Sequence, residues 1–456
     1  MKKILALILA LCMVLALTAC GSSAAPAAEE ATAAEAPAEE AAAEEAPAEE
    51  AAEATGKVYY LNFKPEADEA WQELAALYTE QTGVPVKVVT AASGSYSDTL
   101  TAEMAKSDAP TLFQMGNAYS LLDWGDYALD LTGTPVVGEM TNTDFALTGD
   151  DGSIKAIAYC LESYGIITNV ALLEEAGYTL ADITDFDSLK AVADDIHARA
   201  DELGFDAFTS AGLDGSSSWR FSGHLTNMPL YYEFRDDGVT TPPAEVSGAY
   251  LDNYRAIWDL YIDDSAAEKS SLTSATGDQA EAEFGEGKAV FFQNGTWEFS
   301  NLTDTFGMDP ATITMIPIYC GVDGEEDAGL CTGTENYWAV NSNASEDDIQ
   351  ATLDFIYWCV TSEEGTSMMA EQFGPIPFNS AKESENVFVK AADEYIAAGK
   401  YPVTWAFNST PNVDSWRAGI VDALAAYSAD QSDANWEQVV SAFVDGWAIE
   451  WATVNG

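Results

Sequence analysis

The chain after its first fifty or so residues alternates between short apolar runs and amphipathic stretches. KVYYLNF (57–63) predicts a β-strand, and apolar positions then recur at helical spacing from Ala67 to Tyr78, as far as a stop signal at Gly83. VPVKVV (84–89), SYSDTLTAEMAKS (95–107) and PTLFQM (110–115) predict strand, helix and strand. This β-α-β-α-β order favours a mostly parallel sheet with helices on both faces.

The rest of the chain continues the α/β pattern. GDDGS (149–153) predicts a hairpin turn before the strand IKAIAYC, and LKAVADDIHARADEL (189–203) and YLDNYRAIWDLYI (250–262) predict helices. The last hundred residues are predicted to be mainly helical. Because residues 57–456 are too many for a single hydrophobic core, we expect at least two lobes. Ligands of open α/β sheets bind at the carboxyl ends of the strands, so residues that follow strands are the first candidates for a site.

The N-terminal segment predicts export. Residues 1–19 join two lysines to a short apolar run, which is typical of a signal peptide, and LTAC (17–20) resembles the lipobox of bacterial lipoproteins. That resemblance implies a lipid on Cys20 and a location on the outer face of the cell membrane. The alternative is an ordinary signal peptide with a chance cysteine. Residues 20–56 are almost entirely Ala, Glu and Pro, which predicts a solvated tether.

The net charge excludes one class of partner. The chain has 76 acidic and 18 basic residues, a formal charge of −58. Such a surface repels phosphate backbones, so nucleic acid is excluded and strongly anionic ligands are disfavoured. Most of this acidity is explained by the solubility of an exported domain.

Histidine and cysteine give no sign of a metal or catalytic site. Only His197 and His224 are present, their spacing to the cysteines matches no zinc site, and GxSxG, Walker and GxGxxG motifs are absent from the sequence. We therefore predict no metal, no cofactor and no catalytic residues. Cys320 and Cys331 flank the acidic turn GVDGEEDAG, where either a disulfide or two free thiols would fit.

Tryptophan supplies the strongest chemical signal. The chain contains 12 Trp residues, and several lie on predicted helix faces as expected of a core. Four others stand beside turns and polar residues: Trp219, Trp297, Trp338 and Trp416. An indole offers a flat apolar face that fits the C–H face of a pyranose ring, so these positions favour a neutral sugar over a purely structural role.

Five segments carry a family resemblance. They are IKAIAYCLESYGIITNVALLEEAG (154–177), FGEGKAVFFQNGTWEFSNL (284–302), GTENYWAVNSNAS (333–345), FGPIPFNSAK (373–382) and TPNVDSWRAGIVDALAAY (410–427). In order and spacing they resemble extracellular solute-binding proteins of the maltose- and maltodextrin-binding type, the sugar-binding lipoproteins of ABC transporters. The resemblance extends over essentially all of residues 57–456.

The resemblance implies a periplasmic-binding-protein fold, with two α/β lobes, a hinge and an interlobe ligand cleft. It places the first lobe at residues 57–161 and 337–376 and the second at 162–336 and 377–456. It further implies a monomer that is not an enzyme and that delivers its sugar to the transmembrane subunits of an ABC permease.

The resemblance also implies a set of binding residues. Trp297 and Trp416 match family tryptophans that stack on sugar, and Glu162 falls at the position of a hinge carboxylate that accepts sugar hydroxyls. The other candidates are Lys64, Glu66, Gln114, Asn117, Trp219, Asn336 and Trp338. Gln114 and Asn117 replace the Trp and Asp typical of maltodextrin binders, which puts a maltodextrin ligand in doubt.

Three alternatives stay open at this point. A secreted glycoside hydrolase would also use tryptophans together with a pair of carboxylates. A carbohydrate-binding surface adhesin would need no permease. Within the transport interpretation, the acidic balance also permits a polyamine or another small cation, because aromatic rings bind cations well.

Overall fold

The computed structural model describes residues 55–92, 94–239 and 241–456. The predicted signal peptide, Cys20 and the tether as far as residue 54 lie outside the described residues. Among the helices of the described part, none is both long enough and apolar enough to cross a membrane.

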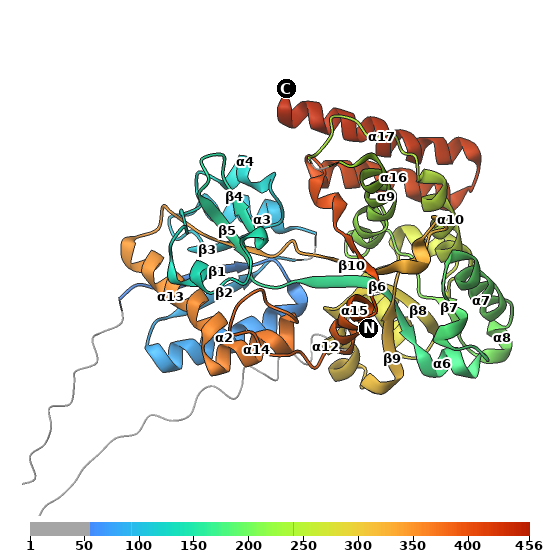
Figure 1. Ribbon diagram of the computed structural model, residues 1–456, viewed down its shortest axis with the longest axis horizontal. Coiled ribbons are helices and arrows are strands. Elements are labelled where there is room, and N and C mark those ends of the chain that lie inside the picture. The colour runs from blue at the N-terminus through green and yellow to red at the C-terminus, as the bar shows by residue number, and fades with distance from the viewer. Residues whose placement is uncertain (1–54, 93, 240) are drawn as a thin grey trace, which may run out of the picture. The chain divides into compact units, whose positions relative to one another are not determined.

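The first sheet has six strands in the order β2-β1-β3-β11-β5-β4 (Figure 1). They are β1 (Val58–Asn62), β2 (Val86–Thr90), β3 (Leu112–Met115), β4 (Ala146–Thr148), β5 (Ile154–Ala158) and β11 (Tyr337–Val340). The predicted β-α-β-α-β run is confirmed, since β1 pairs in parallel with both β2 and β3. The sheet is mixed rather than mostly parallel, because the late strand β11 enters it antiparallel to β3 and β5.

The second sheet has the order β12-β10-β6-β8-β7, with β9 also paired to β6. Its strands are β6 (Glu162–Asn169), β7 (Asp206–Phe208), β8 (Ala289–Gly295), β9 (Ile313–Ile316), β10 (Ala328–Gly333) and β12 (Tyr401–Thr404). β6 runs antiparallel to β8, β9 and β10. This sheet is also mixed, because β10 pairs in parallel with β12 and β7 in parallel with β8.

Helices surround both sheets. The α-helices are α2 (Asp68–Thr82), α3 (Tyr96–Met104), α4 (Ser120–Trp124), α5 (Pro135–Gly138), α6 (Val170–Glu175), α7 (Phe186–Ala198), α8 (Ala200–Leu203), α9 (Asn227–Asp237), α10 (Leu251–Asp263), α11 (Gly277–Gly285), α12 (Glu298–Ser300), α13 (Glu346–Thr361), α14 (Glu363–Phe373), α15 (Val387–Ala397), α16 (Val413–Ala429) and α17 (Asp433–Asn455). The helix predicted at 189–203 divides into α7 and α8, because the backbone of Arg199 leaves helical geometry.

Short 3-10 and π-helical turns occupy many of the connections. They are η1 (Pro65–Ala67), η2 (Thr143–Phe145), η3 (Leu180–Asp182), η4 (Arg220–His224), η5 (Lys269–Ser274), η6 (Asn301–Thr305), η7 (Pro310–Thr312), η8 (Glu325–Asp327) and η9 (Ala406–Ser409). Three of them bear on the site described below: η1 contains Glu66, the π-helical turn η4 contains His224, and η9 contains Phe407.

Each sheet has apolar side chains on both faces. In the first sheet, Tyr60 packs in one cluster with Trp71 of α2, whereas its neighbour Leu61 packs in another with Leu100 of α3. In the second sheet, the neighbours Ile166 and Ile167 of β6 likewise belong to different clusters. Because successive side chains of a strand point to opposite faces, this alternation requires helices on both sides of each sheet.

The two sheets are joined by short crossovers. Residues 159–161 connect β5 to β6, and residues 334–336 connect β10 to β11. The crossovers are hydrogen-bonded to each other, since the amide of Tyr159 donates to the carbonyl of Asn336 at 3.0 Å. Glu162 and Asn336 therefore lie at the junction between the sheets.

Candidate functional site

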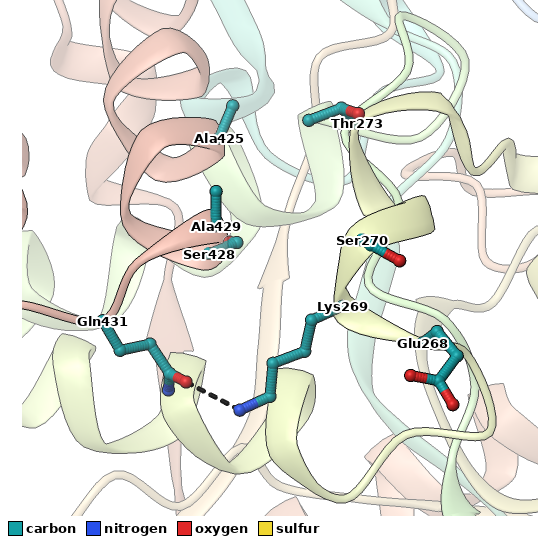
Figure 2. A pocket seen from close by; sticks show the side chains of 8 residues that line it. All are labelled: Glu268, Lys269, Ser270, Thr273, Ala425, Ser428, Ala429 and Gln431. Carbon is teal, nitrogen blue, oxygen red and sulfur yellow. Dashed lines mark hydrogen bonds between the residues drawn. The ribbon is translucent and has the colours of Figure 1, made fainter.

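The surface holds a pocket that does not involve the predicted residues. It has a volume of about 620 Å³ and lies between η5 and α16 (Figure 2). Its lining residues are Glu268, Lys269, Ser270, Thr273, Ala425, Ser428, Ala429 and Gln431. The Lys269 ammonium donates to the Gln431 side chain at 2.7 Å. No candidate from the sequence lines this pocket, whereas several of them meet at the junction between the sheets.

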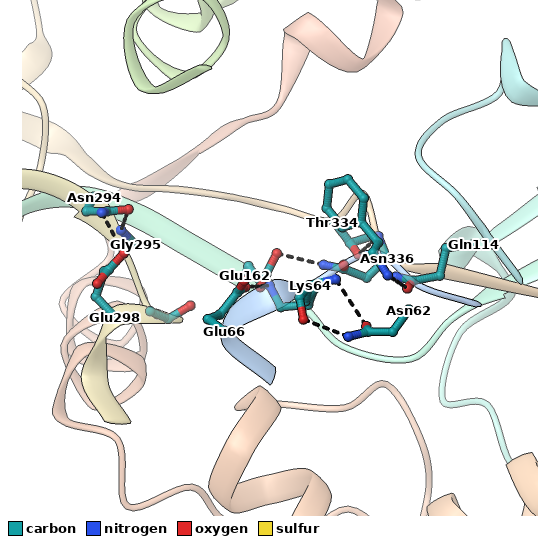
Figure 3. Close-up of polar contacts among 12 residues, drawn as sticks. Asn62, Lys64, Glu66, Gln114, Glu162, Asn294, Gly295, Glu298, Thr334 and Asn336 are labelled. Carbon is teal, nitrogen blue, oxygen red and sulfur yellow. Dashed lines mark hydrogen bonds and ion pairs between the residues drawn. The ribbon is translucent and has the colours of Figure 1, made fainter. Parts of the chain in front are cut away.

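At the junction, a buried lysine is held by two carboxylates. Lys64 follows β1, and its Nζ lies 2.5 Å from Glu162 Oε1 and 2.9 Å from Glu66 Oε1 (Figure 3). Asn336 Nδ2 donates to the other oxygen of Glu162 at 2.6 Å. Four candidates from the sequence, Lys64, Glu66, Glu162 and Asn336, are thus brought together.

The sequence around Lys64 explains its placement. The Asn62 side chain accepts from the amide of Lys64 at 3.0 Å and donates to its carbonyl at 2.6 Å, which fixes the turn after β1. Burial alone lowers the pKa of the Lys64 ammonium, but the charges of Glu162 and Glu66 outweigh it, and the net effect raises the pKa above its usual range. Lys64 is therefore a buried, charged donor.

Trp297 connects this group to the second sheet. It follows β8, and Lys64 Nζ lies 5.5 Å from the centre of its ring. The indole folds back over Gly295, where an added Cβ would lie 2.2 Å from ring carbons. The glycine of the NGTW segment is therefore required by the close approach of this ring. Trp219 lies next to Trp297, with 5.9 Å between ring centroids, and both indoles are partly exposed.

The rings of Tyr164, Trp405 and Phe407, together with the two indoles, surround the ring of His224. We call these six residues, Tyr164, Trp219, His224, Trp297, Trp405 and Phe407, the His224 cluster. The His224 ring stacks on Tyr164 at 4.0 Å and lies 4.9 Å from Trp219 and 5.4 Å from Trp297. His224 was not among the candidates predicted from the sequence. It lies five residues after Trp219, and a π-helical turn such as η4 brings residues at that spacing close together.

Two carboxyl groups adjoin the His224 cluster. Glu298 follows Trp297 in the chain; burial raises its pKa to about 8, and the carboxylates of Glu281 and Glu66 contribute to the rise. Glu335 lies 3.5 Å from the guanidinium of Arg417, and burial raises its pKa above the usual range. The cluster therefore combines partly exposed indoles with nearby carboxyl groups.

Two of the predicted tryptophans are core residues, which corrects their assignment as sugar-stacking positions. Trp338 is 0% exposed and stacks on Tyr159 at 4.7 Å, because it lies on the face of β11 covered by α2. Trp416 is 2% exposed, and its Nε1 donates to the carbonyl of Phe443 on α17 at 2.9 Å. Neither indole has a free face, so we do not retain them in the site.

Gln114 of β3 and Asn117, which follows β3, form hydrogen bonds with other residues near the first sheet. The side-chain oxygen of Gln114 accepts from Tyr60 Oη at 2.8 Å, and its nitrogen donates to Tyr159 Oη at 3.0 Å. The Asn117 oxygen accepts from the amide of Ser120 at 3.2 Å. Neither side chain is hydrogen-bonded to Lys64, Glu66, Glu162 or Asn336, so both are left out of the site that we propose.

The cysteines are free thiols in the described part of the chain. Cys320 and Cys331 are both buried, and Cys331 Sγ lies 3.7 Å from the sulfur of Met228. The disulfide considered for this pair is therefore not present, because Cys331 points into the apolar core of the second sheet. Within residues 55–92, 94–239 and 241–456, no group of three or more His, Cys, Asp and Glu residues could hold a metal ion.

A comparison with family models identifies the chain. The model of the bacterial extracellular solute-binding proteins matches residues 73–398, which is more than half of the 456 residues. The chain belongs to this family. No curated protein matches it by sequence.

Solved structures of solute-binding proteins resemble the chain closely in fold. The solute-binding protein RafE in complex with raffinose is 15% identical, with a TM-score of 0.68 over 86% of this chain and 100% of that one. A chitin oligosaccharide binding protein is 16% identical, with a TM-score of 0.64 over 88% and 99%. A sugar transporter from Bacillus licheniformis in complex with stachyose is 16% identical, with a TM-score of 0.61 over 87% and 98%. These likenesses show the two-lobe fold that the sequence predicted.

Proposed function

We propose that this solute-binding protein is the substrate receptor of an ABC-type sugar importer, and that it captures a sugar or oligosaccharide between its two lobes. The observation that carries the proposal is the meeting of Lys64 and Glu162 with the partly exposed ring of Trp297 at the junction of the sheets. An aromatic face beside charged donors and acceptors suits a pyranose ring with its apolar face and hydroxyl edge. Structural neighbours in complex with raffinose and stachyose, and a chitin oligosaccharide binding protein, support the sugar class.

The roles that we assign follow from the chemistry of each side chain. Trp297 and Trp219 supply the stacking surface, Glu162 and Glu66 accept hydroxyls, and Lys64 and Asn336 donate. We assign residues 57–161 and 337–376 to the first lobe and the remainder of 162–456 to the second, with the crossovers as the hinge. Lys64 comes from the first lobe and Trp297 from the second, so a ligand held by both favours the closed arrangement.

The closed arrangement is the form that we expect the permease to recognise. In this proposal the protein is a monomer held at the outer face of the cell membrane by a lipid on Cys20, and it releases its sugar unaltered. No catalytic step is assigned to any residue.

The test is titration calorimetry of the purified chain against raffinose, stachyose, chitin and xylan oligosaccharides, with thermal denaturation in parallel. A bound saccharide raises the melting temperature, because it stabilises only the folded state. We expect stoichiometric binding of at least one saccharide and no change in the sugar on chromatography. Release of shorter sugars supports the hydrolase instead, and binding of spermidine with no saccharide binding supports the cation alternative.

The surface adhesin is separated by the length dependence of affinity. A receptor that closes around its ligand loses affinity once the oligosaccharide outgrows the space between the lobes. An adhesin with an open groove keeps or gains affinity for the polymer. Tight binding of long xylan or chitin chains therefore contradicts the transport proposal.

A further inference from the structure

The proposed sugar contacts give no role to His224, although its ring lies at the centre of the aromatic cluster. Its ring contacts both partly exposed tryptophans, at 4.9 Å from Trp219 and 5.4 Å from Trp297. On the other side it stacks on Tyr164 of β6 with an interplanar angle of 5°. The ring is 4% exposed, so it lies behind the indoles rather than beside them.

The backbone around His224 is held firmly to the second sheet. The Tyr164 hydroxyl donates to the carbonyl of His224 at 3.1 Å. Arg220, at the start of the same π-helical turn, donates to the carbonyl of Gln293 on β8 at 3.3 Å and to Ser217 Oγ at 2.7 Å. Because β8 leads directly to Trp297, these bonds fix the turn that carries Trp219 and His224 to the strand that positions the second indole.

The His224 ring contacts its neighbours as a neutral aromatic ring. Among the residues that the structure describes, Nδ1 of His224 is buried without a hydrogen-bond partner. Burial lowers the pKa of the imidazole well below its usual range, and the charges of Arg417, Arg220 and Lys64 lower it further. The ring is therefore neutral, and it acts on its neighbours through packing.

We propose that His224 is a positioning residue whose ring sets the angle between Trp219 and Trp297, and thereby the surface that receives the saccharide. This inference rests on the proposed function. The two indole planes meet at 54°, and His224 lies within packing distance of both. Without the ring, each indole can turn toward the space left behind it, and the shared surface is lost.

The binding test compares three variants. His224→Leu removes the ring, His224→Phe restores an aromatic ring without its nitrogens, and Phe221→Leu removes a buried ring from the same turn. Phe221 packs on Trp258, away from both indoles, and is therefore the matched control. Because the His224 ring contacts both indoles, we expect H224L to weaken saccharide affinity about tenfold.

The control should keep affinity within about twofold, because it is not in contact with the indoles. H224F should recover most of the affinity lost in H224L. The inference is overturned if H224L binds as tightly as the original chain or if F221L loses as much. Equal losses in H224F and H224L also overturn it, because a nitrogen rather than the ring would then be the essential part.

A second measurement needs no ligand. The two indoles should contribute a near-ultraviolet circular dichroism signal as a pair. We assign to the pair the part of the spectrum that is lost both in Trp219→Phe and in Trp297→Phe. H224L should lose that signal, whereas F221L should keep it; the reverse contradicts the inference. If the chain binds no saccharide at all, the proposed function fails, yet this signal still decides whether His224 orients the pair.

Discussion

Each lobe of the protein contains a cluster of aromatic rings, and the two differ in what covers them. In the first lobe, four buried rings pack against one another, and we call them the Trp338 cluster: Trp71 of α2, Tyr159, Trp338 of β11 and Phe373 of α14. In the His224 cluster of the second lobe, the inner rings are buried but Trp219 and Trp297 keep part of their surface exposed. Similar side chains thus form a buried core in one place and, in the other, a partly exposed surface that we propose binds a sugar.

The difference shows that ring content alone does not make a sugar site. The rings of the Trp338 cluster have no exposed face. In the His224 cluster, Trp297 lies beside Lys64, and the polar groups around Lys64 are oriented by Asn62 and Asn336. A stacking surface becomes useful for recognition only where polar groups are held beside it.

Removing the central ring of the Trp338 cluster should have the largest effect, and on stability alone. Trp338→Ala should lower the free energy of unfolding by about 3–5 kcal/mol, because it leaves a cavity between Trp71 and Tyr159. Urea denaturation measures the loss. Trp124→Ala, at a partly exposed position of the same lobe, is the control and should cost less. Loss of saccharide affinity in the folded W338A protein would contradict the division between the clusters.

The buried carboxyl group of Glu298, beside the His224 cluster, should make the stability of the protein depend on pH. In the unfolded chain Glu298 ionises near its usual pKa of 4.5, whereas burial in the folded protein raises its pKa to about 8. The folded state therefore holds a proton that the unfolded state releases, and stability falls as pH rises between these values. For one proton, the free energy of unfolding falls by up to ~1.4 kcal/mol per pH unit in this range.

The Glu298→Gln variant isolates this contribution. Relative to the original chain, E298Q should gain stability steadily as pH rises from about 4.5 to 8, as followed by denaturation at each pH. Glu385→Gln is the control, because that carboxylate is exposed and paired with Lys390. A constant difference between E298Q and the original chain across this window would contradict the burial of a protonated Glu298.

The two tryptophans singled out first by the family resemblance should now behave differently. Trp297→Ala should weaken saccharide binding by about 2 kcal/mol, near thirtyfold, because it removes a partly exposed stacking face. Trp416→Ala should instead lower the melting temperature and leave the affinity of the folded protein unchanged. Calorimetry together with thermal denaturation separates the two effects. Equal losses of affinity in both variants would return Trp416 to the site.

The smallest expected effect concerns the support of Trp297. Gly295→Ala places a Cβ 2.2 Å from carbons of the Trp297 indole, so the ring must move. We expect a loss of about 1 kcal/mol in saccharide binding. Gly419→Ala on α16, where an added Cβ meets nothing within 4 Å, should leave affinity unchanged. If G295A binds like G419A, the position of the ring is not set by Gly295.

Much of the architecture could be predicted from local patterns. The apolar stripe from Ala67 to Tyr78 became α2, and the three apolar runs around it became parallel strands, because their periodicities are those of a helix and of buried strands. The mixed character of both sheets could not be predicted in this way, since it depends on where β6 and β11 enter from the other lobe. Strand direction is a property of the connection rather than of the strand.

The positions of the candidate site residues could be anticipated only in part. Four candidates implied by the family resemblance, Lys64, Glu66, Glu162 and Asn336, lie together in the structure, and their role in binding stays a prediction. Trp338 and Trp416 had the same polar neighbours in sequence as Trp297, yet they are buried. Whether a single side chain is buried depends on which helix covers it. The covering helix can come from a distant part of the sequence, as α17 does for Trp416.

The sequence by itself determined the α/β class, the need for two lobes and the family, because periodicity, length and motif order are properties of the chain. The tertiary structure decided which indoles are partly exposed, that His224 lies behind them, and that Lys64 after β1 meets Glu162 of β6 and Trp297 after β8. These features depend on distances between segments that only packing brings together, so no local pattern specifies them.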